Sequence, residues 1–201
     1  MKELILSRRS IRKYTNYKIP RDELVEIIEL AQRAPSSRNL QPWRLFVIES
    51  DEAKEKLRKS MTLNLLQLET SSHLILVTVD PDKYQWSEKI FTKAYQEGVM
   101  PKEVMEKQIQ MSKDTKYDPK DPNYINTLFL DAGLFALNFM YAAKIYGYDT
   151  CPIAGFNKST VNDNLGIPKN LIPTLLISIG KADEEGYSSI RLSSDETTKW
   201  L

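Results

Sequence analysis

The chain has 201 residues, of which 41% are hydrophobic and 27% are charged, and its formal net charge is +1. These values are ordinary for a globular protein of one domain or two small ones, and the net charge argues against the broad basic surface that general nucleic-acid binding requires. The single cysteine, Cys151, and the single histidine, His73, exclude an internal disulfide and the usual zinc sites, so we expect no metal. No run reaches the roughly 18 apolar residues of a membrane span, and the first residues lack a signal-peptide pattern, so we expect a cytoplasmic protein with no membrane partner.

A basic cluster follows the short apolar run at residues 4–6. Arg8, Arg9, Ser10 and Arg12 lie within residues 8–12. A guanidinium matches a phosphate with two parallel donors, and a serine hydroxyl adds another, so the cluster predicts a site for an anion such as a phosphate monoester. The alternative is a solvated basic helix end, and the cluster considered alone favours that alternative.

The next segments alternate between helical and extended patterns. Residues 21–34 have the apolar spacing of an amphipathic helix that ends before Pro35, and residues 36–42 are a polar loop. Residues 43–48 predict a strand, and a helix is expected from about Asp51. Residues 74–79 are a run of β-branched and apolar residues that ends at Asp80-Pro81, typical of a buried strand followed by a turn.

Residues 84–122 are polar and rich in Lys, Glu and Gln. Two helices fit this segment, one near 86–97 and one that begins at Pro101, where proline suits the first helical turn. The segment is predicted to be an excursion from the core, such as a lid. The alternative is an ordinary helical hairpin on the surface.

Residues 124–147 are the longest apolar segment and predict a helix buried on most sides, either central in the domain or shared with a second subunit. Asp131 and Asn138 argue against a membrane span, and Gly147 is a natural end for the helix. A short helix near 159–165 and a buried strand at 175–179 follow. The polar tail at about 186–201 is long enough to lie over a partner subunit.

Together these elements predict a mixed α/β fold with helices on both faces of one sheet. The lengths of the crossovers permit some parallel strand pairs, but the pattern is not a regular βαβ alternation. The sequence has neither a dinucleotide-binding glycine motif nor a phosphate loop. His73 stands at the start of a buried strand, which favours a structural role, and Cys151 has no activating neighbour in sequence, which favours a buried filler. A phosphorylated cofactor that brings its own chemistry would suit such a chain.

Three ordered motifs resemble those of the FMN-dependent nitroreductase family, and the match extends from residue 4 to about residue 192. The motifs are Arg8-Arg9-Ser10-Ile11-Arg12-Lys13-Tyr14, then Ala34-Pro35-Ser36-Ser37-x-Asn39-x-Gln41-Pro42-Trp43, and finally Pro152-Ile153-Ala154-Gly155-Phe156. The resemblance implies an α/β (α+β) fold: a nitroreductase-like three-layer α/β/α sandwich around a mixed, largely antiparallel sheet. It implies a single domain over residues 1–201 and a domain-embracing homodimer with two FMN molecules where the subunits meet.

The implied activity is that of an NAD(P)H:FMN oxidoreductase. In the ping-pong cycle of this family, NADPH or NADH gives a hydride to flavin N5 and leaves, and a small-molecule acceptor then takes the electrons. Nitroaromatics, quinones and free flavins are typical acceptors. Two alternatives remain at this stage: a non-catalytic flavin storage or sensing protein, and a binder of nucleic acid or acidic partners, which the net charge of +1 opposes.

The resemblance also implies roles for individual residues, although no side chain is expected to act as a catalytic acid or base. At the phosphate and ribityl end it implies Arg8, Arg9, Ser10 and Arg191. At the ring it implies Arg12 and Gln67 near N1, Asn64 at the pyrimidine edge, and Pro152, Ile153, Ala154 and Gly155 along the ring, with the Gly155 N–H directed at N5. From the other subunit it implies Pro35, Ser36, Ser37 and Asn39. Ala154, Gln67 and Ser189 stand where some members carry Glu, Lys and Lys, which bears on the flavin potential.

Overall fold

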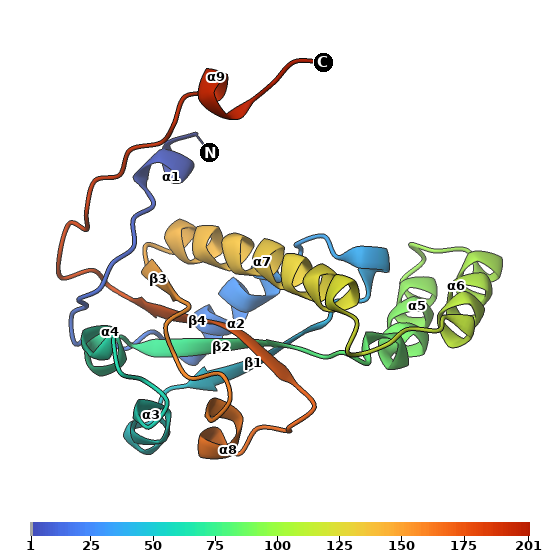
Figure 1. Cartoon of the computed structure of the whole chain (residues 1–201), viewed down its shortest axis with the longest axis horizontal. Coiled ribbons are helices and arrows are strands. Elements are labelled where there is room, and N and C mark those ends of the chain that lie inside the picture. Colours follow the sequence, from blue (N-terminus) through green and yellow to red (C-terminus); the bar gives the residue numbers. More distant parts are fainter. Residues whose placement is uncertain (1) are drawn as a thin grey trace.

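A computed structural model describes residues 2–201 of the chain (Figure 1). In chain order the elements are α1 (Lys2–Ser7), α2 (Arg21–Ala31), η1 (Ser37–Asn39), β1 (Trp43–Ile48), α3 (Asp51–Arg58), α4 (Leu65–Thr70), β2 (His73–Val79), η2 (Lys83–Trp86), α5 (Ser87–Gln96), α6 (Lys102–Asp114), α7 (Pro122–Ile145), β3 (Asp149–Ile153), α8 (Val161–Leu165), β4 (Ile172–Gly180) and α9 (Ser194–Thr197). The strands and the longer helices that the sequence predicts are confirmed.

The sheet has the strand order β1-β2-β4-β3, and every pair of neighbouring strands is antiparallel. Among residues 2–201, parallel pairing occurs only at an isolated bridge between Ser10 and Thr150. The parallel pairing that the crossover lengths permit is therefore limited to this one bridge among the described residues. The connections from β1 to β2 and from β3 to β4 reverse the chain direction, whereas β2 and β3 run in the same direction but are separated by β4.

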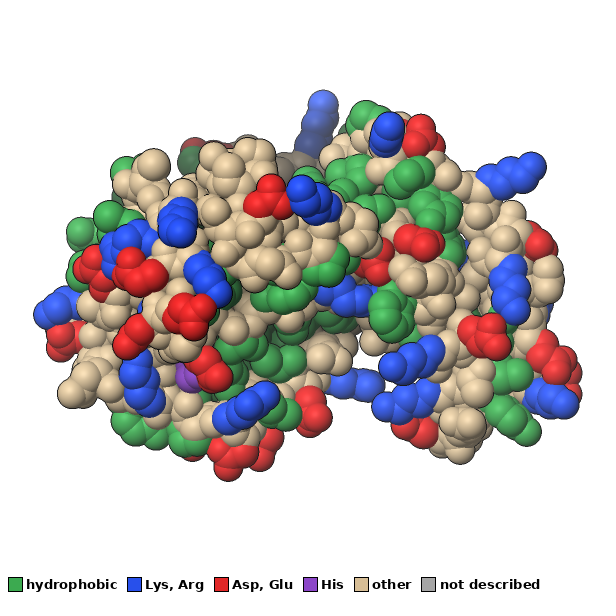
Figure 2. All heavy atoms as spheres, turned by 90° about the horizontal axis from the view of Figure 1, so that it is seen from below, with side chains coloured by type: hydrophobic (Ala, Val, Ile, Leu, Met, Phe, Trp, Pro, Cys, Tyr) green, Lys and Arg blue, Asp and Glu red, His purple; other side chains and the backbone are tan. Residues whose placement is uncertain are grey.

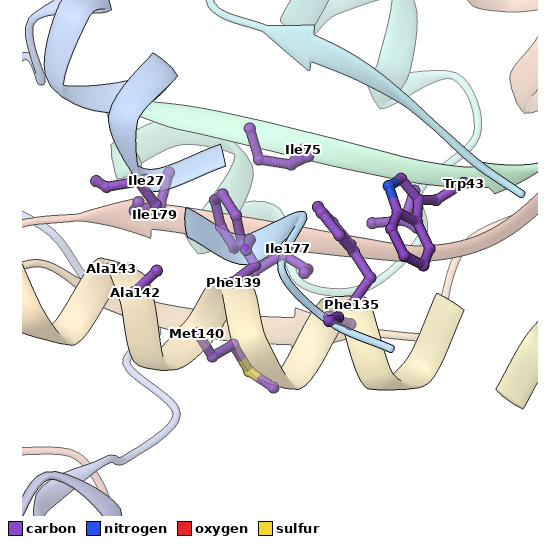
Figure 3. Packing of buried hydrophobic residues seen from close by; sticks show 14 of the residues in the cluster. Ile27, Trp43, Ile75, Phe135, Phe139, Met140, Ala142, Ala143, Ile177 and Ile179 are labelled. Atoms are coloured by element: carbon purple, nitrogen blue, oxygen red, sulfur yellow. The ribbon is translucent and has the colours of Figure 1, made fainter. Parts of the chain in front are cut away.

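Helices cover both faces of this sheet, as predicted. Side chains of successive residues in a strand point to opposite faces. Ile75 and Val77 of β2 accordingly pack with α2 and α7, whereas Leu74 and Leu76 pack with α3, α4 and α8. On the first face, Phe135 and Phe139 of α7 reach the sheet, as Figure 3 shows. The result is a three-layer arrangement with an apolar core on each side of the sheet.

Helix α7 crosses the sheet as the largest helix of the first layer. Its inner residues are fully buried, but Leu130 is 64% exposed and Leu137 is 43% exposed. Within the single chain α1 contacts α7, but these leucines remain exposed, so a helix shared with a second subunit stays a prediction. By length and composition α7 could cross a membrane, but half of its most apolar window is buried, as is usual for the core helix of a globular protein. As expected, its end is formed by Gly147, which has φ 77°.

One predicted helix boundary changes clearly, and helix α4 was not expected. Helix α2 ends at Ala31 rather than residue 34, because N–H groups of Arg33 and Ala34 bond three residues back and tighten the last turn. Helix α4 has only six residues, too few to show an apolar repeat. It begins after Asn64, which takes the left-handed conformation at φ 61°.

Helices α5 and α6 pack together as a hairpin beyond one end of the sheet, which confirms the two helices expected in this segment (Figure 1). The tail at 186–201 is extended and exposed, and its only helix is α9. Ile190 and Trp200 are 94% and 91% exposed. The lid role of the hairpin and the contact of the tail with a partner subunit stay predictions.

Candidate functional site

The basic segment at residues 8–12 lies along the edge of β3. Ser10 forms the bridge with Thr150, and the N–H of Ile11 donates to the Thr150 carbonyl at 3.1 Å. Tyr14 fixes the next residues, since its ring is buried and its hydroxyl lies 2.8 Å from Ser178 Oγ. Gly180 makes room for this ring, because a Cβ there would stand 2.9 Å from Tyr14 Cδ1. The sheet therefore holds the start of the basic segment in a fixed place.

The C-terminal tail returns to the same place. Gly186 has φ +71°, and a Cβ on it would stand 2.9 Å from Ile11 Cδ1, so glycine allows both the turn and the close approach. A cavity of about 150 Å³ results, lined by Arg8, Arg9, Ser10, Arg12, Tyr187, Ser188, Ser189 and Arg191. The fold thus brings Arg191 to the arginines of the first motif, as the resemblance implies.

The four guanidiniums of this cavity carry positive charge that the chain does not neutralise. Within residues 2–201 no carboxylate lies within 4 Å of them as an ion-pair partner. Within the described residues these guanidiniums donate to backbone carbonyls. Arg9 Nη1 donates to Leu6 O at 2.6 Å, and Arg12 Nη1 donates to Ser10 O at 3.2 Å. Like charges held together in this way favour the binding of an anion.

A second group of predicted residues lies beside this cavity, around Cys151 of β3. Gln67 is buried and donates to Asn64 Oδ1 at 3.1 Å, and Asn64 Nδ2 would lie 3.5 Å from a Cβ on Gly155. Burial raises the pKa of the Cys151 thiol, and Gln67, Arg12 and Ser10 oppose this shift from close by. A neutral buried thiol is consistent with the prediction that Cys151 only fills space in the core. The polar groups close to it are then the side chains of Asn64 and Gln67 and the backbone of Gly155.

The loop at 35–39 does not share this cavity. Its Ser37 donates from both N–H and hydroxyl to Asp131 Oδ1 of α7, at 2.9 and 3.0 Å. Asp131 Oδ2 lies 3.6 Å from Nζ of Lys83, and both side chains of this ion pair are 3% exposed. Arg38, with φ 57°, donates to Ser112 and Thr115 of the hairpin at 3.2 Å each. Hydrogen bonds therefore hold the loop to α7 through Ser37 and to α6 through Arg38.

Sequence reasoning missed these supporting residues. In the sequence Asp131 argues only against a membrane span, and nothing in the pattern distinguishes Lys83 or Arg38. The one available signal was an acidic residue in an otherwise apolar helix, since a buried carboxylate requires partners.

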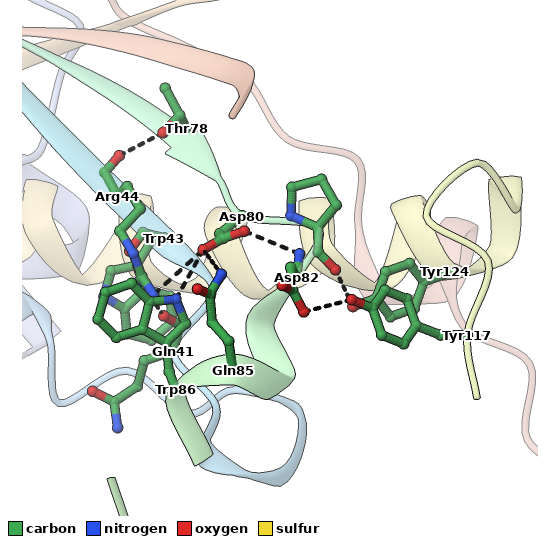
Figure 4. Close-up of polar contacts among 11 residues, drawn as sticks. Gln41, Trp43, Arg44, Thr78, Asp80, Asp82, Gln85, Trp86, Tyr117 and Tyr124 are labelled. Carbon is green, nitrogen blue, oxygen red and sulfur yellow. Dashed lines mark hydrogen bonds and ion pairs between the residues drawn. The ribbon is translucent and has the colours of Figure 1, made fainter. Parts of the chain in front are cut away.

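A polar network anchors the base of the hairpin (Figure 4). Asp80 is buried and accepts from Trp86 Nε1 at 2.8 Å and from Gln85 Nε2 at 3.1 Å. The Arg44 guanidinium lies 4.1 Å from the centre of the Trp86 ring and 3.8 Å from the Asp80 carboxylate. Tyr124 adds a bond from its hydroxyl to the Pro81 carbonyl at 2.6 Å. These contacts fix Trp86 and the start of α5 against β1.

His73 takes the structural role that its position predicts. Its ring is buried at the start of β2, with Nδ1 at 3.0 Å from Ser72 Oγ. Burial lowers its pKa, and Glu49, at 3.5 Å from Nε2, opposes the shift. Within residues 2–201 no group of three or more His, Cys, Asp or Glu side chains could hold a metal ion.

A sequence model described as the nitroreductase family matches residues 5–181. The chain belongs to this family. YdgI of Bacillus subtilis, named as an NAD(P)H nitroreductase, is 42% identical over 202 residues, which cover 98% of this chain and 96% of YdgI.

Two solved structures are similar over the whole chain. One, from Staphylococcus epidermidis and named as an NAD(P)H:FMN oxidoreductase, has a TM-score of 0.93 at 35% identity and is covered over 95% of its length. The other, a nitroreductase from Exiguobacterium sibiricum solved in complex with FMN, has a TM-score of 0.93 at 36% identity and is covered over 96%. The fold is that of the nitroreductase family, and family membership places the chain among the oxidoreductases.

Proposed function

We propose that this chain is a cytoplasmic FMN-dependent NAD(P)H oxidoreductase that passes electrons to nitroaromatic, quinone or flavin acceptors in a ping-pong cycle. The observation that carries the proposal is the cavity with four guanidiniums free of carboxylate partners, next to Asn64, Gln67 and Gly155. An FMN complex is part of the description of one solved relative, and NAD(P)H is named for others.

The phosphate of FMN fits the arginine cavity by charge. Arg8, Arg9 and Arg191, with the Ser10 hydroxyl, are donors in reach of one small space of about 150 Å³. Charge-assisted hydrogen bonds contribute roughly 1.5–3 kcal/mol each. Three of them approach the −8 kcal/mol or so that micromolar affinity requires, before any burial of the ring is counted.

The ring of FMN is proposed to lie beside Asn64, Gln67 and Gly155, which are close together. FMN supplies the redox chemistry when bound, because its N5 accepts and returns a hydride. The chain supplies position and charge: Asn64 and Gln67 are polar partners for the ring, and Pro152, Ile153, Ala154 and Gly155 offer a surface along it. Arg12 contributes a fixed positive charge that favours negative charge on the flavin.

The loop at 35–39 is proposed to complete the site of a second subunit. It lies outside the arginine cavity of its own chain and is held rigidly by Asp131 and Arg38. The exposed apolar face of α7, with Leu130 and Leu137, supports a homodimer because such a face is usually covered.

The first experiment measures flavin content and reduction. The purified protein is expected to be yellow, or to become so with added FMN, and to bleach anaerobically with NADPH or NADH. A colourless protein that takes up no FMN overturns the proposal. Bound FMN without turnover on any acceptor class would instead favour flavin storage or sensing.

Variants then assign the roles. Arg8→Ala with Ser10→Ala is expected to lower FMN affinity by two to three orders of magnitude, or about 3–4 kcal/mol. Arg12→Ala is expected to slow flavin reduction more than it weakens binding. Arg21→Ala removes an exposed arginine at the start of α2 and is the matched control. Unchanged flavin retention in the double variant would contradict the phosphate assignment.

A further inference from the structure

A second and larger cavity lies between helix α5 and the main body of the molecule. It measures about 600 Å³ and is bounded by the end of α2, the loop that leads into β1, and α5. Four cations line it, Arg33, Arg44, Lys89 and Lys93, together with one carboxylate. Figure 2 shows a hollow between the body and the hairpin, with Lys and Arg side chains along it. We call this cavity the basic cleft.

The positive charge of the basic cleft is only partly balanced. Lys93 pairs with Glu97 at 3.6 Å, and Arg44 lies 3.8 Å from Asp80. Arg33 and Lys89 have no ion-pair partner within 4 Å among residues 2–201. They stand on opposite walls, one just after α2 and the other on α5, so an anion between them would contact both elements.

The walls of the basic cleft are held in place. Trp86 is fixed by its bond to Asp80, its ring lies under the Arg44 guanidinium, and Lys89 Nζ is 5.8 Å from the ring centre. Arg44 in turn donates to the carbonyls of Gln41 and Trp43 at 2.9 and 2.7 Å. A rigid aromatic side chain between cations is a good surface for a phosphate-bearing ligand, because little order is lost on binding.

The basic cleft continues from the loop proposed to reach the flavin of a second subunit. Asn39 and Gln41 line it and have positive φ angles of 55° and 46°. The left-handed backbone at both residues turns the chain so that the same short loop borders the cleft and carries Ser36 and Ser37. A ligand in this cleft would therefore lie next to the loop that the proposed function assigns to flavin binding.

We propose that the basic cleft binds the phosphate groups of the pyridine dinucleotide and that its charge favours NADPH over NADH. This inference rests on the proposed function, in which NAD(P)H reduces the flavin. A volume of about 600 Å³ suits part of a dinucleotide better than a lone phosphate. The 2′-phosphate of NADPH adds roughly 1.5–2 negative charges, as phosphate monoesters do near neutral pH, so it gains more from unpaired cations.

The test removes the two unpaired charges together. In the FMN-loaded protein, Arg33→Gln with Lys89→Gln is expected to raise the KM for NADPH by about tenfold or more, as expected when charge-assisted bonds to one phosphate are lost. The KM for NADH should rise less, and the rate of the acceptor half-reaction and the FMN content should stay unchanged. The matched control, Lys107→Gln with Lys120→Gln, removes the same charge from two exposed positions outside the cleft, one on α6 and one in the turn before α7.

A binding measurement separates this inference from the proposed function, because it needs no flavin. Titration calorimetry with 2′,5′-ADP should show binding to the wild-type chain that weakens by a similar factor in the double variant and stays unchanged in the control. Equal binding in all three proteins, or none, overturns the cleft assignment even if FMN binds. A protein that binds 2′,5′-ADP as expected but takes up no FMN refutes the flavin proposal instead. If the double variant changes only the KM for an anionic acceptor and not the KM for NADPH, the dinucleotide assignment is also overturned.

Discussion

The ion pair between Lys83 and Asp131 allows a quantitative test of how the loop at 35–39 is held. Asp131→Asn keeps Oδ1 as an acceptor for Ser37 but places an amide N–H₂ where Oδ2 faced the Lys83 ammonium at 3.6 Å. Both side chains are 3% exposed, so water cannot replace the lost charge. Removing one partner of a buried pair typically lowers the free energy of unfolding by about 3–5 kcal/mol.

The pH dependence of this loss follows from the lysine. Burial already lowers the pKa of Lys83, and Asp131 opposes that shift. Without Asp131 the buried lysine can avoid carrying an unpaired charge by releasing its proton. At an unfolded pKa near 10.4, deprotonation costs about 5 kcal/mol at pH 7 and about 2 kcal/mol at pH 9. These values are upper limits on the loss, which should therefore shrink as the pH rises.

Urea unfolding of wild type and Asp131→Asn at the two pH values measures the loss directly. Lys83→Met in the same background should recover most of it, because the unpaired charge is gone. Glu88→Gln breaks the exposed pair with Lys113 and should cost no more than about 1 kcal/mol. A loss below about 1 kcal/mol for Asp131→Asn at pH 7, or an equal loss at both pH values, would refute the reasoning.

Three further predictions concern single side chains. Burial lowers the pKa of His73 below 6.5, and Glu49 opposes this shift. The contribution of His73 to the free energy of unfolding is therefore present above pH 6.5 and is lost as the pH falls through the lowered pKa. In urea titrations His73→Gln should lose less stability on acidification than wild type, and an identical pH profile would contradict this. Arg38→Ala removes bonds to α6 and should speed amide exchange in α6 relative to β2; unchanged exchange would show that the hairpin is held without it. Gly180→Ala places a Cβ 2.9 Å from Tyr14 Cδ1 and should lower the free energy of unfolding by about 1–3 kcal/mol, less in a Tyr14→Leu background; no loss would mean that the ring moves freely.

Local pattern predicted most of the elements. The strand at 43–48 is apolar apart from Arg44, the strand at 74–79 is a run of apolar and β-branched residues, and the helix that begins at Pro122 is apolar along most of its length. Strand direction was not predictable in this way, because it depends on how each connection crosses the sheet. Helix α4 was missed since six residues contain too few turns for a repeat.

Some residues of the candidate site could be identified from local motifs, and others could not. The motif residues of the arginine cavity were identified from the sequence, and the fold brings Arg191 to them across more than half of the chain. The supports of the loop at 35–39 were not, because Ser37 and Asp131 are 94 positions apart and no local rule connects them. Backbone features such as the left-handed Arg38 and Gln41 also have no signature in side-chain chemistry.

The bridge between Ser10 and Thr150 has a consequence for how copies of this chain can associate. It covers the middle of the outer edge of β3, whereas β1, at the other edge of the sheet, pairs only with β2 among residues 2–201. Strand addition can therefore occur on one side of the sheet and is blocked on the other. Edge pairing that can proceed from one side alone ends after a single step, so the sheet is protected against growth into open-ended fibres.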